Sequence, residues 1–350
     1  MNKSVSVIDV SIDKKEVTRW NRYVNAHPLG TLYHQLSWKS LIQATFGHQC
    51  YFLAAQDGEG NIVGVLPLVN LRSRLFGNFI VSVPYFNYGG VIADDEKIEK
   101  ALIDHAIKIG GKNKVSYIQF RQQGEHPVIN LPASQDKVNM ILQLPDTFEA
   151  LGKSIGSKRR SQCRRATKEN VRFCVGGKEL LDDFYAVFSE NMRDLGTPVY
   201  GKSFFKAITD TFPENVKIAV VYLDDIPVST GFLMRYKNQM EIPWASTLRR
   251  TNGISMNMYL YSEILKYSIE SGCEKFDFGR SSKNAGTYKF KKQWGAEPLQ
   301  LHWYQWLPEG SEAPDLSPKN AKFDLAISVW QKLPLWLTNL LGPFLVKNLP

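Results

Sequence analysis

The densest cluster of residues able to do chemistry lies between residues 276 and 304, FDFGRSSKNAGTYKFKKQWGAEPLQLHWY. An expected strand ends there on Asp277 and Arg280, and a loop opened by two glycines follows. The loop interleaves phenol and ammonium groups with aromatic rings: Tyr288, Lys289, Phe290, Lys291, Lys292 and Trp294. Acyl transfer to an amine or hydroxyl needs a cation or N–H donors where the carbonyl oxygen becomes negative. We therefore name Lys291 as the candidate catalytic residue, with Asp277 and Tyr288 beside it.

A different interpretation of this cluster stays open. Phe276, Phe278, Phe290 and Trp294 are of the types that form protein cores, and the lysines between them can simply face water. On the first interpretation Arg280 and Phe290 contact the donor and Trp294 contacts the acceptor; on the second they are structural.

A second candidate site is the turn Leu-Arg-Arg-Thr-Asn-Gly-Ile-Ser between an expected strand ending at Thr247 and an expected helix after Ser255. The first N–H groups of a helix are unpaired, and its dipole adds positive charge there, so this turn could hold an anion with Arg249, Arg250, Gly253 and Ser255. Residues 250–255 also fit the Q/R-x-x-G-x-G/A signature of GNAT acyltransferases, with Ser in the last position. The alternative is a solvated arginine pair in an ordinary loop, with Asn252 or Ser255 capping the helix.

The charge of the chain is concentrated in one segment. Of the net charge of +9 on 350 residues, residues 153–172 contribute +7, from eight basic side chains and Glu169, which leaves +2 for the rest. Arg160, Arg164 and Lys168 have the spacing of one helical face, which predicts a contact with RNA or with phospholipid. A solvated face that only links two domains is the alternative.

The positioning elements repeat along the chain. Residues 51–121 are expected to form three strands, a helix and a strand, and residues 217–280 repeat this order at an offset of roughly 160 residues. The repeat and the length predict a mixed α/β chain with a first domain over 1–150, a second over 151–310 that carries the site, and a tail over 311–350.

Composition excludes several classes. Hydrophobic residues at 43% and charged residues at 22% describe a globular protein. The four cysteines form no CxxC pair and the six histidines form no HExxH pattern, so neither a metal site nor a disulfide framework is expected, and a reducing cytoplasm fits best. The longest uncharged apolar stretch, residues 333–346, is shorter than a membrane span of about 20 residues. The tail should either pack on the first domain or lie in a membrane interface.

These motifs together give the chain a resemblance to a known family. The basic segment, GTPVY, the RRTNGIS turn and FDFGRSS with YKFKKQWG resemble FemAB-type transferases and related acetyltransferase domains of the GNAT superfamily. With YFNYGG and the ending ISVWQKLPLWLTNLLGP, the order looks most like the FemAB-like subgroup of exosortase (PEP-CTERM) and exopolysaccharide systems.

The resemblance implies two tandem GNAT-like domains and a catalytic lysine in the Phe-Lys pair, which falls on Phe290 and Lys291. It places Tyr85 at the precursor contact of the first domain, and we expect Tyr88 and Tyr200 to join it. The sequence departs from the family at this contact, because the PRGP motif is missing, and it also lacks the charged helical arm of some members. The segment with Arg160, Arg164 and Lys168 is then the substitute for the missing arm as a tRNA contact.

The resulting hypothesis is a cytoplasmic acyl or aminoacyl transferase without a tightly bound cofactor. Its donor is acyl-CoA or aminoacyl-tRNA, and its acceptor is an amine or hydroxyl of an envelope peptide, polysaccharide or lipid-linked precursor, with a peripheral contact to the inner membrane. The alternative from another class is a membrane-associated scaffold in which the duplicated fold has lost catalysis.

Overall fold

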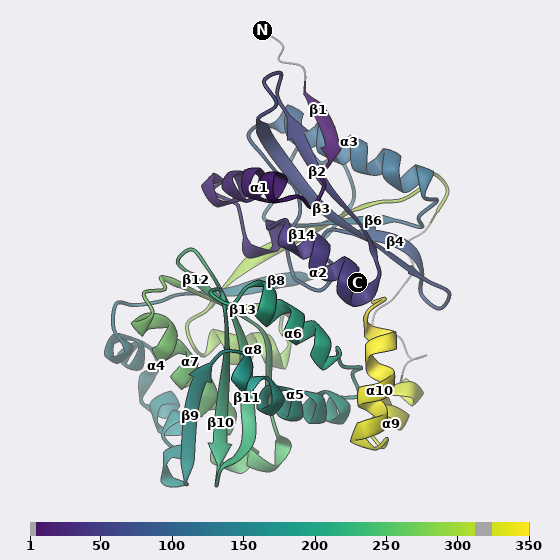
Figure 1. The fold of residues 1–350 in the computed structure, drawn as a ribbon. Coiled ribbons are helices and arrows are strands. Elements are labelled where there is room, and N and C mark those ends of the chain that lie inside the picture. The colour runs from purple at the N-terminus through teal and green to yellow at the C-terminus, as the bar shows by residue number, and fades with distance from the viewer. Residues whose placement is uncertain (1–4, 312–323, 350) are drawn as a thin grey trace. The chain divides into compact units, whose positions relative to one another are not determined.

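The computed structural model describes residues 5–311 and 324–349 and divides the chain into two compact units (Figure 1). Of the described residues, the first unit holds 5–138, 299–311 and 348–349, and the second holds 139–298 and 324–347. The chain therefore passes from the first unit to the second twice and returns to the first unit twice, at residues 299 and 348.

The first unit contains three antiparallel strands, a crossover helix and a parallel fourth strand. These are β2 (Gln49–Gln56), β3 (Ile62–Ser73), β4 (Gly77–Val81), α3 (Glu96–Lys112) and β6 (Ile118–Gln123). The sheet order is β1-β2-β3-β4-β6-β14, with β5 on β3 and β7 on β14. The added elements are β1 (Ser6–Asp9), α1 (Lys14–Ala26), η1 (Leu32–His34), α2 (Ser37–Phe46), β5 (Ile92–Ala93), β7 (Ala133–Ser134) and β14 (Glu297–Trp306). Leu66, Leu102 and Phe120 lie fully buried between the sheet and α3.

The second unit repeats this plan. Its strands β10 (Val216–Leu223), β11 (Ile226–Tyr236) and β12 (Gln239–Thr247) are antiparallel, and β13 (Lys275–Ser282) pairs parallel with β12 after helix α7 (Met256–Glu270). The order is β8-β13-β12-β11-β10-β9, and β9, β10 and β11 are seen side by side in Figure 1. The other elements are β8 (Lys137–Gln143), α4 (Phe148–Cys163), η2 (Ala166–Lys168), β9 (Val171–Gly176), η3 (Lys178–Leu180), α5 (Leu181–Leu195), α6 (Lys202–Thr211), η4 (Arg249–Ile254), α8 (Gly286–Lys292), α9 (Asp324–Trp330) and α10 (Leu335–Val346).

The predicted duplication of a mixed α/β unit is confirmed. In each unit an antiparallel pair of strands is followed by a crossover helix, α3 or α7, and then by a strand that pairs in parallel. The structural division differs from the expected boundary between residues 150 and 151. It falls after Val138, and β14 lies mostly in the first unit.

One expected strand is shorter than its sequence suggests. The β-branched and aromatic residues of NFIVSVPYF, residues 78–86, predict an extended strand throughout, but β4 ends at Val81. Val83 has a positive φ of 45°, and the following Pro84 has no N–H for a sheet ladder. The chain turns away here and carries Tyr85 and Phe86 into the core of the unit.

Aromatic rings form the core between α5, α6 and the sheet of the second unit. Phe205 of α6 is fully buried, and its ring centroid lies 4.9 Å from that of Phe184, 5.3 Å from Phe188 and 5.1 Å from Trp244. Edge-to-face arrangements dominate, which is the geometry that ring quadrupoles favour. This cluster fixes α5 and α6 against β11 and β12.

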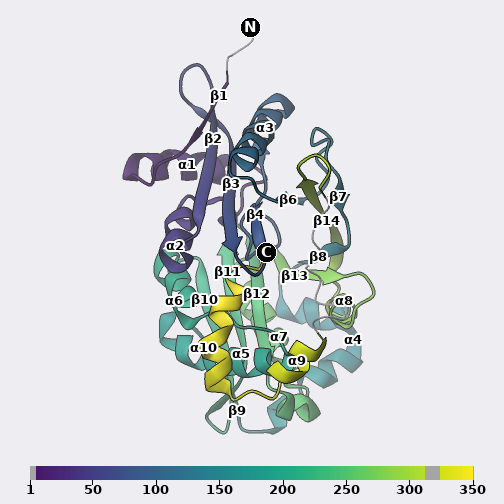
Figure 2. The same ribbon diagram turned by 90° about the vertical axis from the view of Figure 1, so that its right-hand side faces the viewer.

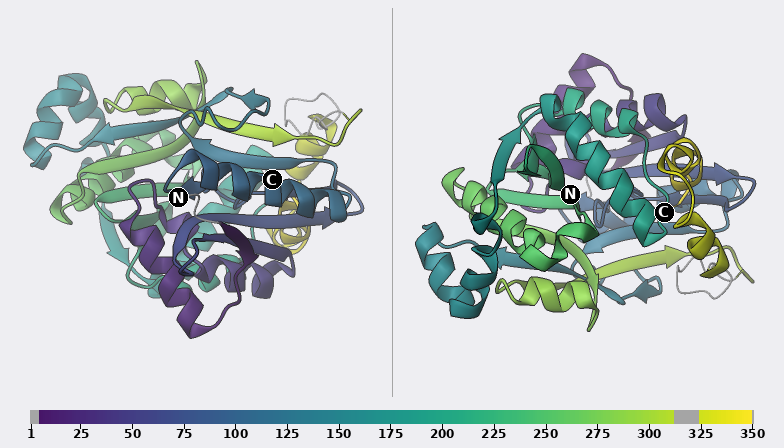
Figure 3. Two further views of the ribbon diagram at one scale, coloured as in Figure 1. Left: turned by 90° about the horizontal axis from the view of Figure 1, so that it is seen from above. Right: turned by 90° about the horizontal axis from the view of Figure 1, so that it is seen from below.

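The tail helices α9 and α10 belong to the second unit, whereas the sequence predicts a tail that packs on the first domain or lies in a membrane interface. Helix α10 lies against α5 (Figures 2 and 3). A Cβ atom on Gly342 would lie 2.9 Å from the backbone N and O of Val199, so the two backbones are in direct contact. The part of the predicted tail between residues 312 and 323 lies outside the described residues.

The ring cluster predicts a large loss of stability for Phe205→Ala. Removing a fully buried ring leaves a cavity, and such changes cost about 3–5 kcal/mol. The free energy of unfolding, measured by urea denaturation, should fall by this amount. Leu195→Ala, at a side chain on α5 that is 50% exposed, is the control and should change it by less than about 0.5 kcal/mol. Equal effects of the two substitutions would contradict this account of the core.

Candidate functional site

The sheet of the second unit opens between β12 and β13. The two strands pair over only three positions, from Gln239 with Lys275 to Glu241 with Asp277, although both continue beyond them. A register shift against β11 places two residues of β12, at 242 and 243, opposite one residue. Such a bulge bends and twists its strand, so β12 diverges from β13 immediately after Glu241. Divergence between two strands of a sheet leaves backbone groups on their facing edges available to a bound molecule.

The side chain of Lys291 contacts the part of β13 that follows its short pairing with β12. Its Nζ donates hydrogen bonds to the carbonyl oxygens of Gly279, at 3.0 Å, and Arg280, at 2.8 Å, and the residue is 8% exposed. Burial lowers the pKa of Lys291 to about 8, and the nearby carboxylate of Asp277 opposes that shift. Two of the three N–H groups of the protonated amine are used in these bonds, so one N–H can still donate to a bound molecule. In the neutral amine, the lone pair is available instead.

Asp277 organises the backbone that holds Lys291. The carboxylate is fully buried and accepts hydrogen bonds from Nδ2 of Asn139, at 3.0 Å, and from the backbone N–H of Gly279, at 2.7 Å. Gly279 has a φ of +74°, a conformation that favours glycine. The carboxylate therefore fixes the turn whose carbonyl accepts from Lys291, so we describe Asp277 as a positioning residue.

Lys291 lies on a short helix, where the sequence predicts a loop. Helix α8 runs from Gly286 to Lys292, and Tyr288 lies one turn before Lys291 on the same side of it. The Phe290 ring is half-buried and lies 5.0 Å from Tyr261, edge to face. Tyr288, Lys291 and Phe290 are thus brought to one short element, and their roles stay predictions.

Three residues that are predicted to contact the acceptor have buried rings, and this role stays a prediction for each of them. Trp294 is 1% exposed and belongs to the core of the second unit. Tyr85 and Tyr88, in the first unit, are 8% and 3% exposed; Tyr85 packs 4.8 Å from Phe46, and Tyr88 5.3 Å from Tyr33. The fourth predicted contact, Tyr200, is half-buried, with its ring 6.2 Å from Trp244 of β12.

The turn before α7 has the expected strand-turn-helix context, but its arginines are engaged by α5. Arg250 forms an ion pair of 2.8 Å with Glu190, and Arg249 donates to the carbonyl oxygen of Asp194 at 2.8 Å. Ser255 has a φ of +58° and its side chain makes no capping hydrogen bond, so the capping role considered for it is absent. Gly253 lies beside open space. The first N–H groups of α7 therefore remain without a side-chain cap from this residue.

The basic segment is not one continuous helical face, as the spacing suggested. Helix α4 is interrupted at Gly156, with a φ of 80° and a ψ of 167°, and it ends at Cys163, so Lys168 lies in the following 3₁₀ helix. Arg160, Arg164 and Lys168 nevertheless line one recess of about 460 Å³, together with Ser157, Ser161 and Arg165. Four cations surround this recess, which makes it strongly attractive to an anion.

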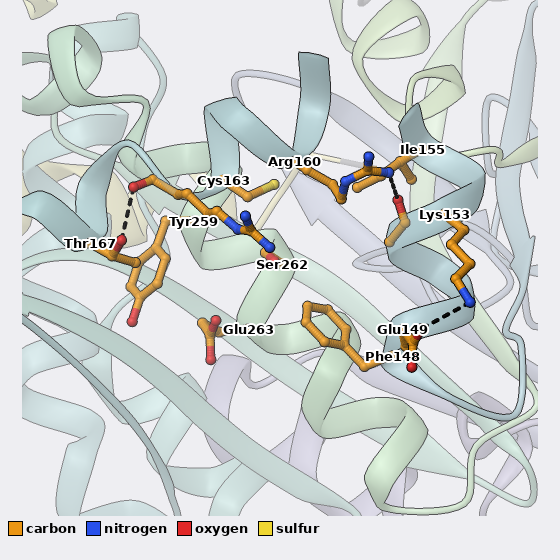
Figure 4. Close-up of a pocket in the computed structure, with 12 residues that line it drawn as sticks. Phe148, Glu149, Lys153, Ile155, Arg160, Cys163, Thr167, Tyr259, Ser262 and Glu263 are labelled. Carbon is orange, nitrogen blue, oxygen red and sulfur yellow. Dashed lines mark hydrogen bonds and ion pairs between the residues drawn. The ribbon is translucent and has the colours of Figure 1, made fainter. Parts of the chain in front are cut away.

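A larger pocket of about 630 Å³ adjoins this recess and shares Arg160 and Arg164 with it (Figure 4). Its walls come from α4 and α7, and Phe148, Ile155 and Tyr259 give it apolar surface. Arg160 Nη1 donates to the carbonyl oxygen of Gly152 at 2.7 Å, which holds the two halves of α4 around the interruption.

Sequence reasoning missed Asn139 and Glu241. Both are buried, at 0% and 5% exposure, on strands β8 and β12 next to the opening. The available signal was a polar residue inside an otherwise apolar strand sequence, VNMIL and MEIPW. Among the residues that the structure describes, no group of three His, Cys, Asp or Glu side chains could hold a metal ion.

Comparison with known proteins finds one matching domain, within the second unit. Residues 157–292 match the model of the acetyltransferase (GNAT) domain. The domain match and the tandem fold support an acyltransferase. No curated protein sequence matches this chain.

Several solved structures share the fold. FemX has a TM-score of 0.66 at 16% identity, over 85% of this chain and 97% of FemX. The C-terminal domain of a putative lysylphosphatidylglycerol synthetase from Agrobacterium fabrum has a TM-score of 0.57 at 13% identity, over 91% and 95% of the chains. A tandem GNAT protein from the clavulanic acid biosynthesis pathway has a TM-score of 0.56 at 11% identity, over 89% and 100%. At these identities the likeness concerns the fold.

The burial of Lys291 predicts a specific pH dependence of stability. In the unfolded chain this amine keeps its proton up to a pKa near 10.5, whereas in the folded protein it loses the proton from about pH 8. The unfolded state binds more protons between these values, so the wild type gains stability as pH rises through them, by up to about 3 kcal/mol. The free energy of unfolding of the wild type relative to Lys291→Met should therefore increase from pH 7.5 to 10.5. The matched control is Lys289→Met, on the exposed side of α8, for which the same difference in the free energy of unfolding should lack this increase. If the difference between the wild type and Lys291→Met does not change with pH, the low pKa of Lys291 is refuted.

Proposed function

We propose that the chain transfers an acyl group to an amine or hydroxyl of a cell-envelope precursor, with Lys291 at the reacting centre. The observation that carries this proposal is the buried ammonium group beside the opening between β12 and β13, held by two backbone carbonyls. The matched GNAT domain covers this region, and the FemX and lysylphosphatidylglycerol synthetase structures with the same fold support an envelope acceptor.

The proposed step begins with the acceptor nitrogen or oxygen attacking the donor's carbonyl carbon. The third N–H of protonated Lys291 donates to the carbonyl oxygen as it becomes negative, which is where fixed donors stabilise a transition state most. The new C–N or C–O bond forms, the bond from carbon to the donor's leaving atom breaks, and the acceptor's proton passes to that atom. Positioning by Asp277 and Gly279 keeps the ammonium in place, so little reorganisation is needed during the reaction.

The donor that we favour is an acyl-CoA thioester. Its pyrophosphate would lie at the start of α7, where Ser255 leaves the first N–H groups uncapped and Arg249 and Arg250 stand on the same turn. The carbonyl oxygen of Arg280 accepts from Lys291, and Phe290 directly precedes Lys291 in α8, so we assign both residues to the donor side of the reacting centre.

One observation favours a second donor class. The recess with Arg160, Arg164 and Lys168 groups four cations that the thioester step does not use. An aminoacyl-tRNA, whose amino acid is held as an ester on its terminal ribose, would bring phosphates to this recess. The transfer chemistry at Lys291 is the same for both donors.

Activity should depend on Lys291 and on its charge. With purified protein, acetyl-CoA or aminoacyl-tRNA, and a peptidoglycan-precursor peptide or amino sugar as acceptor, product formation is followed by mass spectrometry. Lys291→Met should lower kcat by roughly 10²–10³, since it removes one donor to the oxyanion. The wild-type rate should fall above about pH 8, where Lys291 loses its proton.

The control variants separate catalysis from folding. Lys289→Met should keep the wild-type rate, and Lys291→Arg, which stays protonated, should move the alkaline fall to higher pH. A folded Lys291→Met with the wild-type rate would remove this residue from the mechanism. A wild type that transfers from neither donor class, and whose envelope phenotype survives Lys291→Met, would favour the scaffold.

The two donors differ in their dependence on salt. If tRNA binds the recess, log K should fall linearly with log salt, and replacing Arg160, Arg164 and Lys168 by Ala should reduce the slope by about two to three. Replacing Lys97, Lys108 and Lys112, which are exposed on α3, is the control and should leave the slope unchanged. Fluorescence anisotropy with labelled tRNA measures both; an unchanged slope in the first variant excludes the recess as an RNA site.

A further inference from the structure

Helix α10 presents two apolar faces, and only one of them is covered. Thr338, Gly342 and Val346, four residues apart, are buried against the second unit. Trp336, Leu340 and Phe344 have the same spacing, but they are 67%, 56% and 65% exposed. Monomeric proteins rarely leave large aromatic and aliphatic side chains together on one exposed helix face.

The orientation of this helix is fixed by close contacts. Gly342 lies too near the backbone of Val199 to accept a side chain, and Asn339 Nδ2 donates to Ser189 Oγ of α5 at 3.5 Å. The exposed face therefore cannot turn inward without breaking the packing of the covered one. It is a constant surface of the folded second unit.

The exposed apolar surface continues on α9 and is bordered by positive charge. Leu325 is 75% exposed and Val329 is 51% exposed, one turn apart. Residues 325–347 contain no acidic side chain and two lysines, Lys332 between the helices and Lys347 at the end of α10. Apolar residues with Trp and Phe, flanked by lysines, match the chemistry of a bilayer interface with anionic headgroups.

We propose that the surface formed by Leu325, Val329, Trp336, Leu340 and Phe344 docks on an anionic lipid bilayer, with α10 lying along its surface. At 12 residues, α10 is about 18 Å long, which is too short for a hydrocarbon core of about 30 Å. Among the described residues, no helix meets the length and apolarity that a membrane crossing requires. A two-fold contact with a second copy suits this surface less well, because residues 324–347 carry two lysines and a single acid, Asp324, so each copy would bring net positive charge to the contact.

Docking here would place the turn before α7 close to the membrane. The carbonyl oxygen of Asp194, at the end of α5, accepts from both Arg249 of that turn, at 2.8 Å, and Gln331 Nε2 at the end of α9, at 3.1 Å. The lipid-facing helices and the proposed donor site thus share one anchor on α5. A transferase arranged in this way would meet acceptors that are attached to lipid. The docking itself does not depend on the donor or on activity.

The test is co-sedimentation of the full chain with large vesicles of phosphatidylcholine, with or without phosphatidylglycerol. The wild type should sediment with vesicles that contain phosphatidylglycerol. The triple variant Trp336→Ser/Leu340→Ser/Phe344→Ser should bind them at least tenfold more weakly, because tenfold is on the order of the free energy gained by burying one apolar side chain. Leu29→Ser/Ile226→Ser/Leu299→Ser, at exposed apolar positions elsewhere, is the matched control and should bind like the wild type. Lys332→Gln should weaken binding only to the anionic vesicles.

Several results would overturn the proposal. The first is that the wild type binds neither kind of vesicle, and the second is that the triple variant of α10 binds as tightly as the control. Analytical ultracentrifugation gives the third such result, if the wild type is a dimer and the α10 variant is a monomer. Circular dichroism of each variant shows whether it is folded. Since no step of the test uses acyl transfer, failure of the proposed activity would leave a positive binding result intact.

Discussion

The buried carboxylate of Asp277 is the group on which the candidate site depends. A carboxylate is stable inside a protein only when hydrogen bonds or a cation compensate for the lost water. Here Asn139 of β8 and the N–H of Gly279 supply hydrogen bonds, and the charge of Lys291 lies nearby. Satisfying this one group therefore ties three segments together: strand β8, the end of β13 and helix α8. Asp277 fixes the backbone at Gly279, and the carbonyl oxygen of Gly279 accepts a hydrogen bond from Lys291.

In the first unit, an arginine side chain lies at the position that corresponds to the opening between β12 and β13. There β4 and β6 are parallel for two pairs, Ile80 with Ile118 and Val81 with Gln119. The guanidinium of Arg121, 2% exposed, then donates to the carbonyls of Pro84 and Phe86 and lies 4.4 Å from the Trp303 ring. In the second unit, the carbonyl oxygens of Gly279 and Arg280 on the equivalent strand β13 accept hydrogen bonds from Lys291 instead. An arginine of the strand itself thus makes the carbonyl contacts in the first unit, whereas a lysine of the following helix α8 makes them in the second.

The sequence allowed the duplicated fold to be predicted because strand and helix periodicities are local signals. It also directed attention to Lys291, since aromatic and amine side chains alternate around it, and the role of this residue stays a prediction. What it could not supply were relations between distant segments: the Asn139 bond to Asp277 spans 138 positions, and the burial of Tyr85 follows from a turn at Val83. The interruption of α4 at Gly156 depends on a single left-handed residue, which no spacing rule for Arg160, Arg164 and Lys168 could reveal.

Helix α5 connects features that seem unrelated in the sequence. Glu190 pairs with Arg250, with side chains that are 31% and 52% exposed, and an exposed pair of this kind contributes only about 0–1 kcal/mol. If the proposed donor binds at this turn, its phosphate can replace Glu190 at little cost, because charge-assisted bonds to phosphate are at least as strong. Arg249 is different, since its partner is the Asp194 carbonyl, which also holds Gln331 of the tail. One arginine of the turn is thus available for exchange, while the other keeps the turn fixed to the helix on which α10 rests.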